Sequence, residues 1–220
     1  MAAREKQSDL KLDITVKDLG KRFNREWIFR NLNYVFRPSQ IYAITGPNGS
    51  GKSTLLQVLW GQLPQSTGVL TYTTNSNNCN KEISIDDIFK HLTVATPYLD
   101  LIEEFTLSEH LRFHFKLKPS RAGMNEQEIL EKMKLTAARD KHIANFSSGM
   151  KQRVKLGLAF FTQADLIFLD EPTTNLDQEA TAWYHQQLRE LPSHCTIFIA
   201  SNQPTEYPID SQVINILDFK

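Results

Sequence analysis

A glycine-rich stretch at residues 46–53 carries the plainest chemistry in this sequence. It reads Gly-Pro-Asn-Gly-Ser-Gly-Lys-Ser, follows the apolar run 41–44 and precedes the helix-like run 54–59. Glycines allow backbone angles that other residues avoid, so main-chain amides can close around an anion. The order of strand, glycine-rich loop and helix is the context that a phosphate-binding loop requires. A glycine turn beside an unrelated lysine is the alternative, but the complete pattern favours phosphate binding.

Individual positions in this loop have separate roles. The helix that starts near Gly51 adds unpaired amides and the positive end of its dipole. Lys52 is placed to reach the outer phosphates of a nucleotide, and the Ser53 hydroxyl can sit on a magnesium ion. The loop therefore predicts both a phosphate site and part of a metal site.

Two carboxylates form a second candidate site. The apolar run 166–169 leads directly into Asp170 and Glu171, so both acids should lie at the carboxyl end of a buried strand, where open α/β sheets bind ligands. Asp170 is predicted to hold the hydrated magnesium ion, and Glu171 to orient or deprotonate the attacking water. A strand that merely meets its turn would explain the pair alone. Beside a phosphate loop, the catalytic interpretation is favoured.

Composition narrows the function classes. The chain has 220 residues, with 25 Lys and Arg against 25 Asp and Glu, so no excess positive charge indicates a nucleic-acid partner. Cys79 and Cys195 have no metal-ligand spacing, which favours reduced thiols in a cytosolic protein. The polar residues 1–13 lack the apolar centre of a signal peptide, and no later run approaches the length of a membrane helix. We expect a soluble chain whose membrane role would need a partner.

The elements that position these residues follow from periodicity. A polar loop is expected at 73–81, and a helical subdomain at about 98–145, inserted between core strands of one domain spanning 1–220. The final strands should complete a parallel sheet. Expected strands lie at 12–16, 31–36, 41–44, 69–72, 92–96, 166–169, 196–200 and 213–217. Expected helices follow the phosphate loop and lie at 106–118, after Asn125, at 147–161 and at 178–191.

Residues 145–154, which precede the acidic stretch 169–177, resemble the signature of ABC-type ATPases. The resemblance covers essentially the whole chain. It implies an α/β fold: a P-loop NTPase core with a mostly parallel sheet, an N-terminal antiparallel β subdomain and an inserted α-helical subdomain. In this family two ATPase domains pair head to tail. By that resemblance, Ser147, Ser148 and Gly149 would bind the nucleotide held by the opposite chain.

The resemblance also implies roles for single residues. Phe23 lies where the family has an aromatic ring stacked on adenine, although a core phenylalanine is the alternative. Asp177 resembles the loop that links the two ATP sites; a helix cap for the residues from Gln178 onward is the alternative, and both roles could hold. The nucleotide-binding positions implied are Phe23, Gly46, Asn48, Gly49, Ser50, Gly51, Lys52, Ser53 and Thr54, with Ser53 and Asp170 on the metal.

Three departures from the family pattern affect the expected rate. Ser148 and Met150 replace a glycine and a glutamine of the usual signature, and this variant is familiar in the family. The glutamine that usually follows the strand at 92–96 is missing, because Pro97 and Tyr98 are the nearest candidates. Asn202 stands where the family has a histidine that contacts the γ-phosphate, and an amide cannot carry charge or shuttle protons. We therefore predict intact binding of ATP and Mg²⁺ but slow hydrolysis, with Glu171, Lys52 and Asn202 as the catalytic group.

The leading hypothesis is the ATP-binding subunit of an ABC transporter. It implies a second ATPase subunit, in a homodimer or heterodimer, separate membrane-spanning subunits, and a cytoplasmic location, peripheral on the cytosolic face of the membrane. The apolar segment 98–105, with Leu99, Leu101, Ile102 and Phe105, would receive a helix of the membrane partner, or else pack the subdomain core. The alternatives are a non-transport ABC-type ATPase and an ATP-gated dimerising switch. Import and export both stay open, with similarity to compact exporter ATPases that include haem-export subunits.

Overall fold

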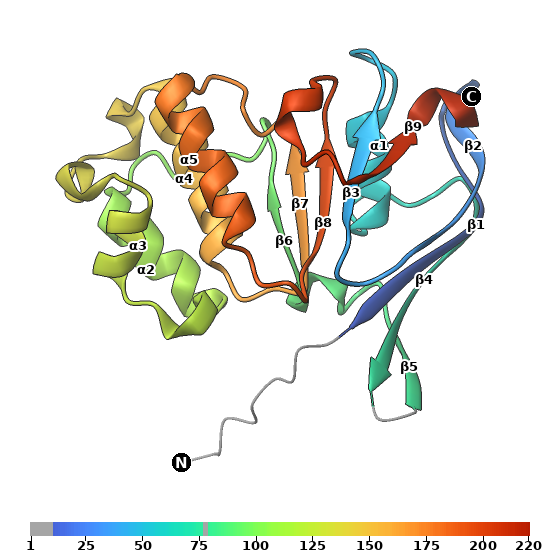
Figure 1. The fold of residues 1–220 in the computed structure, drawn as a ribbon, viewed down its shortest axis with the longest axis horizontal. Coiled ribbons are helices and arrows are strands. Elements are labelled where there is room, and N and C mark those ends of the chain that lie inside the picture. Colours follow the sequence, from blue (N-terminus) through green and yellow to red (C-terminus); the bar gives the residue numbers. More distant parts are fainter. Residues whose placement is uncertain (1–10, 77–78) are drawn as a thin grey trace.

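Two sheets organise the chain, for which the computed structural model describes residues 11–76 and 79–220 (Figure 1). The first is antiparallel with the strand order β2-β1-β4-β5, and the second is parallel with the order β6-β7-β8-β3-β9. The antiparallel strands are β1 (Leu12–Phe23), β2 (Glu26–Phe36), β4 (Thr67–Ser76) and β5 (Cys79–Ile83). The parallel strands are β3 (Ile41–Thr45), β6 (Leu92–Ala95), β7 (Leu166–Asp170), β8 (Thr196–Ala200) and β9 (Gln212–Asn215).

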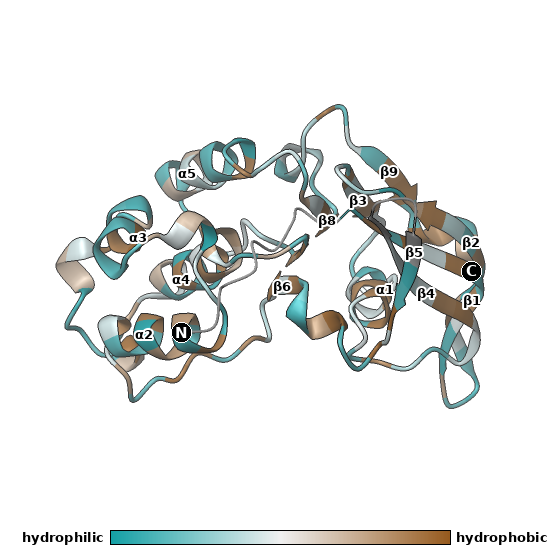
Figure 2. Ribbon diagram, turned by 90° about the horizontal axis from the view of Figure 1, so that it is seen from below, coloured by the Kyte–Doolittle hydropathy of each residue, from teal (hydrophilic) through white to brown (hydrophobic). Residues whose placement is uncertain are grey.

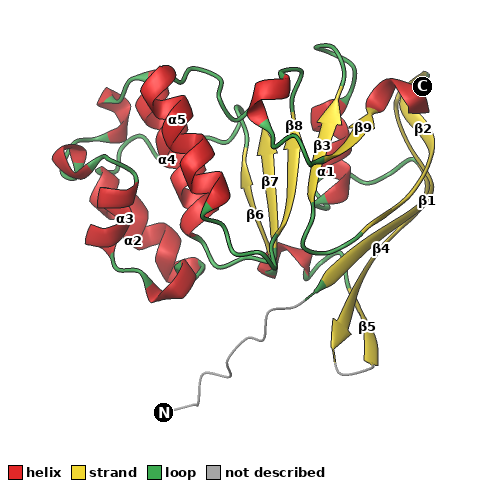
Figure 3. Cartoon of the chain, in the orientation of Figure 1, coloured by secondary structure: helices red, strands yellow, loops and turns green. Residues whose placement is uncertain are grey.

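Helices cover the parallel sheet from both sides (Figure 3). On one side lies α1, between the two sheets, and on the other lie α4 and α5 with α2 and α3 beyond them. The bounds are α1 (Lys52–Leu59), α2 (Leu107–Leu117), α3 (Glu126–Lys132), α4 (Ser148–Phe161) and α5 (Gln178–Arg189). This arrangement confirms the predicted fold class, including the antiparallel β subdomain and the inserted helices. The boundary of the helical subdomain at about 98–145 and the single-domain division stay predictions.

Alternating side chains of the buried strands create a separate core on each face of the parallel sheet. Leu166 and Phe168 of β7 belong to the core that contains α1 and the inner face of the antiparallel sheet. Ile167 and Leu169 belong to the core that contains the four other helices. Figure 2 shows hydrophobic brown on the central strands and hydrophilic teal along α5. The two-sided burial explains why these strands read as continuous apolar runs.

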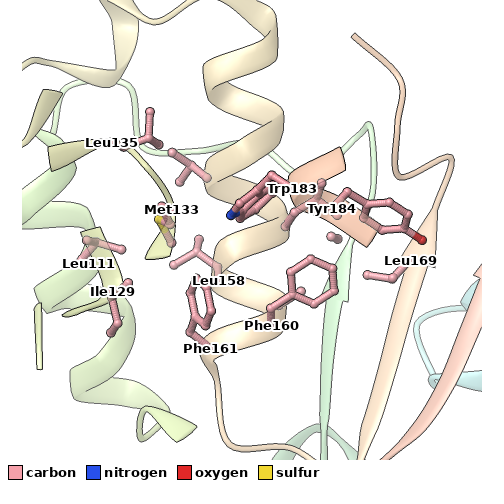
Figure 4. Close-up of a cluster of buried hydrophobic side chains, with 14 of the residues drawn as sticks. Leu111, Ile129, Met133, Leu135, Leu158, Phe160, Phe161, Leu169, Trp183 and Tyr184 are labelled. Atoms are coloured by element: carbon pink, nitrogen blue, oxygen red, sulfur yellow. The ribbon is translucent and has the colours of Figure 1, made fainter. Parts of the chain in front are cut away.

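The helical core joins α2 and α3 to α4, α5 and β7 (Figure 4). Both outer helices start where the sequence predicts, because Thr106 and Asn125 each form a capping box with the glutamate three residues later. Trp183 of α5 packs in this core and donates its indole N–H to Lys132 O at 2.6 Å. The close-up shows Leu111, Ile129, Met133, Leu135, Leu158, Phe160, Phe161, Leu169, Trp183 and Tyr184 converging between these elements.

Several expected boundaries are wrong. The first two strands are longer than the expected 12–16 and 31–36, because β1 runs on to Phe23 and β2 already begins at Glu26, where the two strands pair with each other. The polar residues 73–81 do not form a loop throughout, because β4 runs to Ser76 and β5 begins at Cys79, leaving 77–78 outside the described residues. Thr73 pairs with Glu82 in this ladder, and pairing with a neighbouring strand outweighs a composition poor in β formers. The last strand ends at Asn215, whose side-chain oxygen accepts a hydrogen bond from Leu217 N at 3.1 Å. That bond starts the 3₁₀ turn Ile216–Phe219.

Candidate functional site

The carboxyl ends of three neighbouring parallel strands meet at one edge of the sheet. The phosphate loop follows β3, the acidic pair ends β7, and Asn202 follows β8. Residue pairing fixes their alignment, since Ile44 and Asp170 both lie opposite Ala200. Residues far apart in the sequence are thereby brought to the edge where parallel α/β sheets bind ligands.

The phosphate loop curves tightly around its lysine. Lys52 is buried, and its ammonium group donates to Gly46 O at 3.0 Å and to Pro47 O at 3.2 Å. Gly51 precedes α1 with φ 105°, and a Cβ there would lie 2.3 Å from Ile28 Cγ2, so only glycine fits without a shift. The first amides of α1 have no partners inside the helix and form the positive end of its dipole. The loop therefore combines a cation with amide donors, as an anion site requires.

Asp170 lies next to Ser53 of this loop and is only 2% exposed. Burial raises the pKa of Asp170 to about 6, and the neighbouring charge of Glu171 acts in the same direction. The hydrogen bond with Ser53 and the charge of Lys52 oppose this rise. Among the described residues, Asp170 Oδ1 has no hydrogen-bond partner. A buried carboxylate oxygen and the Ser53 hydroxyl are the oxygen ligands that magnesium takes beside nucleotide phosphates. The residues present therefore fit a magnesium ion.

Glu171 occupies an unusual backbone position. Its φ is 44°, in the left-handed region that non-glycine residues seldom adopt. Its N–H donates to Ala200 O at 2.9 Å, and its carbonyl accepts from Thr174 N at 3.1 Å. Asn202 reaches the phosphate loop, because its amide nitrogen donates to Asn48 Oδ1 at 3.0 Å. The structure thus brings together the three groups predicted for catalysis: Lys52, Glu171 and Asn202.

The signature residues lie on the other side of the sheet from the phosphate loop. Ser147 caps α4 by accepting from Met150 N at 3.2 Å, and Ser148 is exposed. A Cβ on Gly149 would lie 2.9 Å from Asn175 O, so the glycine allows the loop after β7 to approach. Because α4 and α1 pack on opposite faces of the sheet, the signature is separated from the phosphate loop of its own chain.

Phe23 and Asp177 each have two interpretations, and the structure bears on both residues. The Phe23 side chain is 47% exposed at the end of β1, with the Lys21 ammonium 5.0 Å from its ring, so the core alternative is wrong. Asp177 caps α5 by accepting from Ala180 N at 2.7 Å. The capping interpretation of Asp177 is therefore realised, and its proposed link between ATP sites stays a prediction.

The apolar segment 98–105 divides into buried and exposed parts. Leu101 is 8% exposed and belongs to the helical core, as the packing alternative allows. Tyr98 is 79% exposed, and Phe105 packs edge-on against Phe113 of α2, with ring centroids 5.9 Å apart. Tyr98, and Phe113 beside Phe105, are thus exposed apolar side chains, whereas Leu101 is not.

Two buried polar residues near the acidic pair were missed in the sequence. Gln152 of α4 donates its side-chain amide to Pro172 O at 2.9 Å, and Glu206 accepts from Thr173 N at 3.1 Å. The spacing of Gln152 to the buried Leu156 one turn later could have placed it on the inner face of its helix. Glu206 carries no such signal, because it lies in a short polar segment after β8.

Comparison with known proteins agrees with this geometry. The sequence profile of the ABC transporter family matches residues 29–174. The chain is 28% identical to the uncharacterized ABC transporter ATP-binding protein YybJ of Bacillus subtilis (strain 168), over 86% of this chain and 85% of YybJ. It is 32% identical to the cytochrome c biogenesis ATP-binding export protein CcmA of Idiomarina loihiensis, over 80% of this chain and 79% of that protein.

A solved structure shares the fold. It is the dimeric post-hydrolysis state of the ATP-binding cassette MJ0796 bound to ADP and Pi, with a TM-score of 0.74, 21% identity, and coverage of 92% of this chain and 94% of that one. One α/β fold thus carries the phosphate loop, the acidic end of β7 and the signature residues at the start of α4, which is the arrangement of an ABC-type ATPase. The chain belongs to the ABC transporter family and is an ATP-binding subunit of that family. Across the part of the chain that the structure describes, none of the helices has the length and apolar character needed to span a membrane.

Proposed function

We propose that this chain hydrolyses ATP to drive transport through separate membrane-spanning subunits, as a peripheral subunit on the cytosolic face of the membrane. The observation that carries the proposal is the meeting of Lys52, Glu171 and Asn202 at one sheet edge beside the buried Asp170. Phosphoryl transfer depends mainly on positioned charge, and this edge supplies a cation, amide donors and carboxylates.

Each residue has a role in this proposal. The loop amides, with Lys52, bind the phosphates of ATP, and the Phe23 ring, half-exposed at the end of β1, stacks on adenine. Ser53 and Asp170 would hold Mg²⁺, which supplies neutralisation of the phosphate charge. Glu171 accepts a proton from the attacking water or orients it, and Asn202 donates a hydrogen bond toward the γ-phosphate. The remaining phosphate-loop positions are Gly46, Asn48, Gly49, Ser50, Gly51 and Thr54.

A second ATPase subunit completes the site. Ser147, Ser148 and Gly149 start α4 on the opposite sheet face from α1, which supports their use by the nucleotide of a partner chain. The exposed Ser148 and the start of α4 offer amides and hydroxyls to an anion. Asp177 lies between β7 and α5, two residues after Asn175. The carbonyl of Asn175 lies close to Gly149. That placement supports a link between the two ATP sites of a dimer.

Turnover tests the catalytic assignment. We expect slow ATP hydrolysis by the purified chain, faster hydrolysis by Asn202→His, and none by Glu171→Gln. Loss of one positioned donor costs about 10²- to 10³-fold in comparable electrostatic settings, which motivates the slow rate. Brisk hydrolysis by the wild-type chain would show that Asn202 replaces histidine adequately. Full turnover by Glu171→Gln would remove the assignment of Glu171, and long retention of ATP without turnover would favour the switch.

The surface around Tyr98 is proposed to receive the membrane partner. Tyr98 is almost fully exposed, and Phe113 of α2, the edge-on neighbour of Phe105, is 46% exposed. Exposed apolar side chains that gather into one patch are typical of interaction sites. In cells of its source, Tyr98→Glu should lose sedimentation with membranes while keeping ATP binding. Ile209→Glu, at a fully exposed residue elsewhere on the chain, should keep both, and equal losses in the two variants would argue against this surface.

A further inference from the structure

A buried carboxylate contacts the turn at residues 171–174, which we call the acidic turn. Glu206 is 2% exposed and ends the 3₁₀ turn Pro204–Glu206 that follows β8. Its Oε1 accepts hydrogen bonds from the backbone N–H and from the hydroxyl of Thr173. None of the ion pairs found in residues 11–76 and 79–220 includes Glu206. A buried carboxylate with such partners is costly to keep, which calls for a specific role.

The turn that Glu206 contacts carries the strained residue Glu171. A non-glycine residue in the left-handed region costs about 1–3 kcal/mol and persists only where the surroundings determine it. The surroundings here are hydrogen bonds: Gln152 donates to Pro172 O, and Thr173 donates to Glu206. The two residues after Glu171 are therefore each held by a side chain from a different element.

Glu206 is itself fixed in place. The Tyr184 hydroxyl, fully buried on α5, donates to Glu206 O at 2.7 Å. Four residues earlier in the chain, Asn202 donates to Asn48 of the phosphate loop. The segment 202–206 therefore contacts the phosphate loop at one end and the acidic turn at the other.

We propose that the Glu206–Thr173 pair positions Glu171 for hydrolysis, an inference that rests on the proposed catalytic role of Glu171. Glu206 and Thr173 are positioning residues, because they act through the backbone of the turn. Binding of ATP depends on the phosphate loop, which is contacted by Asn202 and not by the hydrogen bonds of the Glu206–Thr173 pair, so loss of the pair should lower kcat and leave KM and the ATP dissociation constant unchanged. A residue that only stabilised the fold would lower the melting temperature without this selective loss of turnover.

Matched variants at Thr173 test the proposal. Thr173→Val keeps the shape but removes the hydroxyl donor, whereas Thr173→Ser keeps the donor. We expect Thr173→Val to lower kcat by about 10- to 100-fold, the range that small misplacement of a catalytic group can cause, with ATP affinity within about twofold of wild type. Thr173→Ser should stay within about threefold of the wild-type kcat. Equal kcat values for the two variants, or parallel losses of kcat and ATP affinity, would overturn the proposal.

A second pair of variants covers a folding failure of Thr173→Val. Glu206→Gln keeps an oxygen that accepts from Thr173, and Glu206→Ala removes it. The expected kcat of Glu206→Gln exceeds that of Glu206→Ala by about tenfold, and equal values overturn the proposal. Glu171→Gln is measured beside them. If that variant turns over like wild type, the catalytic assignment of Glu171 fails by itself, whereas failure of the Thr173 or Glu206 series alone removes only the positioning role.

Discussion

The phosphate loop and the acidic turn lie at the same sheet edge but are held in different ways. Within the phosphate loop the hydrogen bonds are short-range: Ser50 N donates to Pro47 O, and Lys52 donates to carbonyls five and six residues before it. Asn202 and Lys220 add two bonds from far along the chain, to Asn48 Oδ1 and to Ser50 O. The acidic turn depends on distant residues. Gln152 lies 20 residues before its partner Pro172, and Glu206 lies 33 residues after Thr173.

The difference separates binding from turnover. The tight curve of the phosphate loop comes mainly from its own glycines and the helix behind it, so it depends less on distant elements than the acidic turn does. A turn held by side chains from α4 and from the segment after β8 changes when either element moves. We therefore expect substitutions in the phosphate loop to act on nucleotide affinity and substitutions behind the acidic turn to act on turnover.

The largest effect should come from Gly51→Ala. An alanine there would have φ 105° and a Cβ 2.3 Å from Ile28 Cγ2, so the start of α1 must shift. Strain of this kind costs about 1–3 kcal/mol, and we expect ATP affinity to fall by about 100-fold in equilibrium titration with a fluorescent ATP analogue. Gly49→Ala is the matched control, because its φ is also positive, at 76°, but no atom lies within 4 Å of the added Cβ.

The two glycines differ in one respect: a Cβ added at Gly51 would clash with Ile28, and a Cβ added at Gly49 would not. Gly49→Ala should lose clearly less affinity than Gly51→Ala, since it suffers only the backbone strain. Adding Ile28→Ala to Gly51→Ala should restore part of the affinity by removing the clash. Equal losses at the two glycines, with no recovery in the double variant, would show that crowding against Ile28 does not shape the loop.

Local encoding also explains how much of the fold could be predicted. A helix start can be predicted from a capping residue such as Thr106 or Asn125 and the glutamate three residues later, and buried strands can be predicted from apolar runs. The strand β5 could not be predicted, because its residues are polar and its order comes from pairing with β4. Leu101 shows the same limit, since an apolar residue in a short segment gives no sign of whether it faces a core or a partner.

The candidate site divides along the same line. The residues of the phosphate loop and the acidic pair were predicted from contiguous patterns, and the parallel sheet brings them to one edge. Glu206 and Gln152 could not be assigned in the same way, because their partners are far away in the sequence. A buried polar residue is recognised by its surroundings, and a single sequence shows those surroundings only where they are local.

A smaller effect is expected from Gln152→Met, which tests the long-range half of this comparison. Methionine keeps the length of the side chain but leaves the buried Pro172 carbonyl without the amide donor now 2.9 Å away. An unpartnered buried carbonyl costs about 1–3 kcal/mol, so urea unfolding should show a loss of that size. Turnover should fall by about tenfold or less as the turn after Glu171 relaxes, with ATP affinity unchanged.

Gln127→Met provides the control for Gln152→Met, because it makes the same chemical change at an exposed position. Gln127 donates to Glu131 one turn later on α3, and such exposed pairs contribute about 0.2–0.5 kcal/mol. We expect this control to unfold at nearly the wild-type urea concentration and to hydrolyse ATP normally. A stability loss in Gln152→Met no larger than in Gln127→Met would mean that α4 does not hold the acidic turn. A loss of ATP affinity in Gln152→Met would mean instead that the two regions are coupled, since the phosphate loop would then depend on a residue behind the turn.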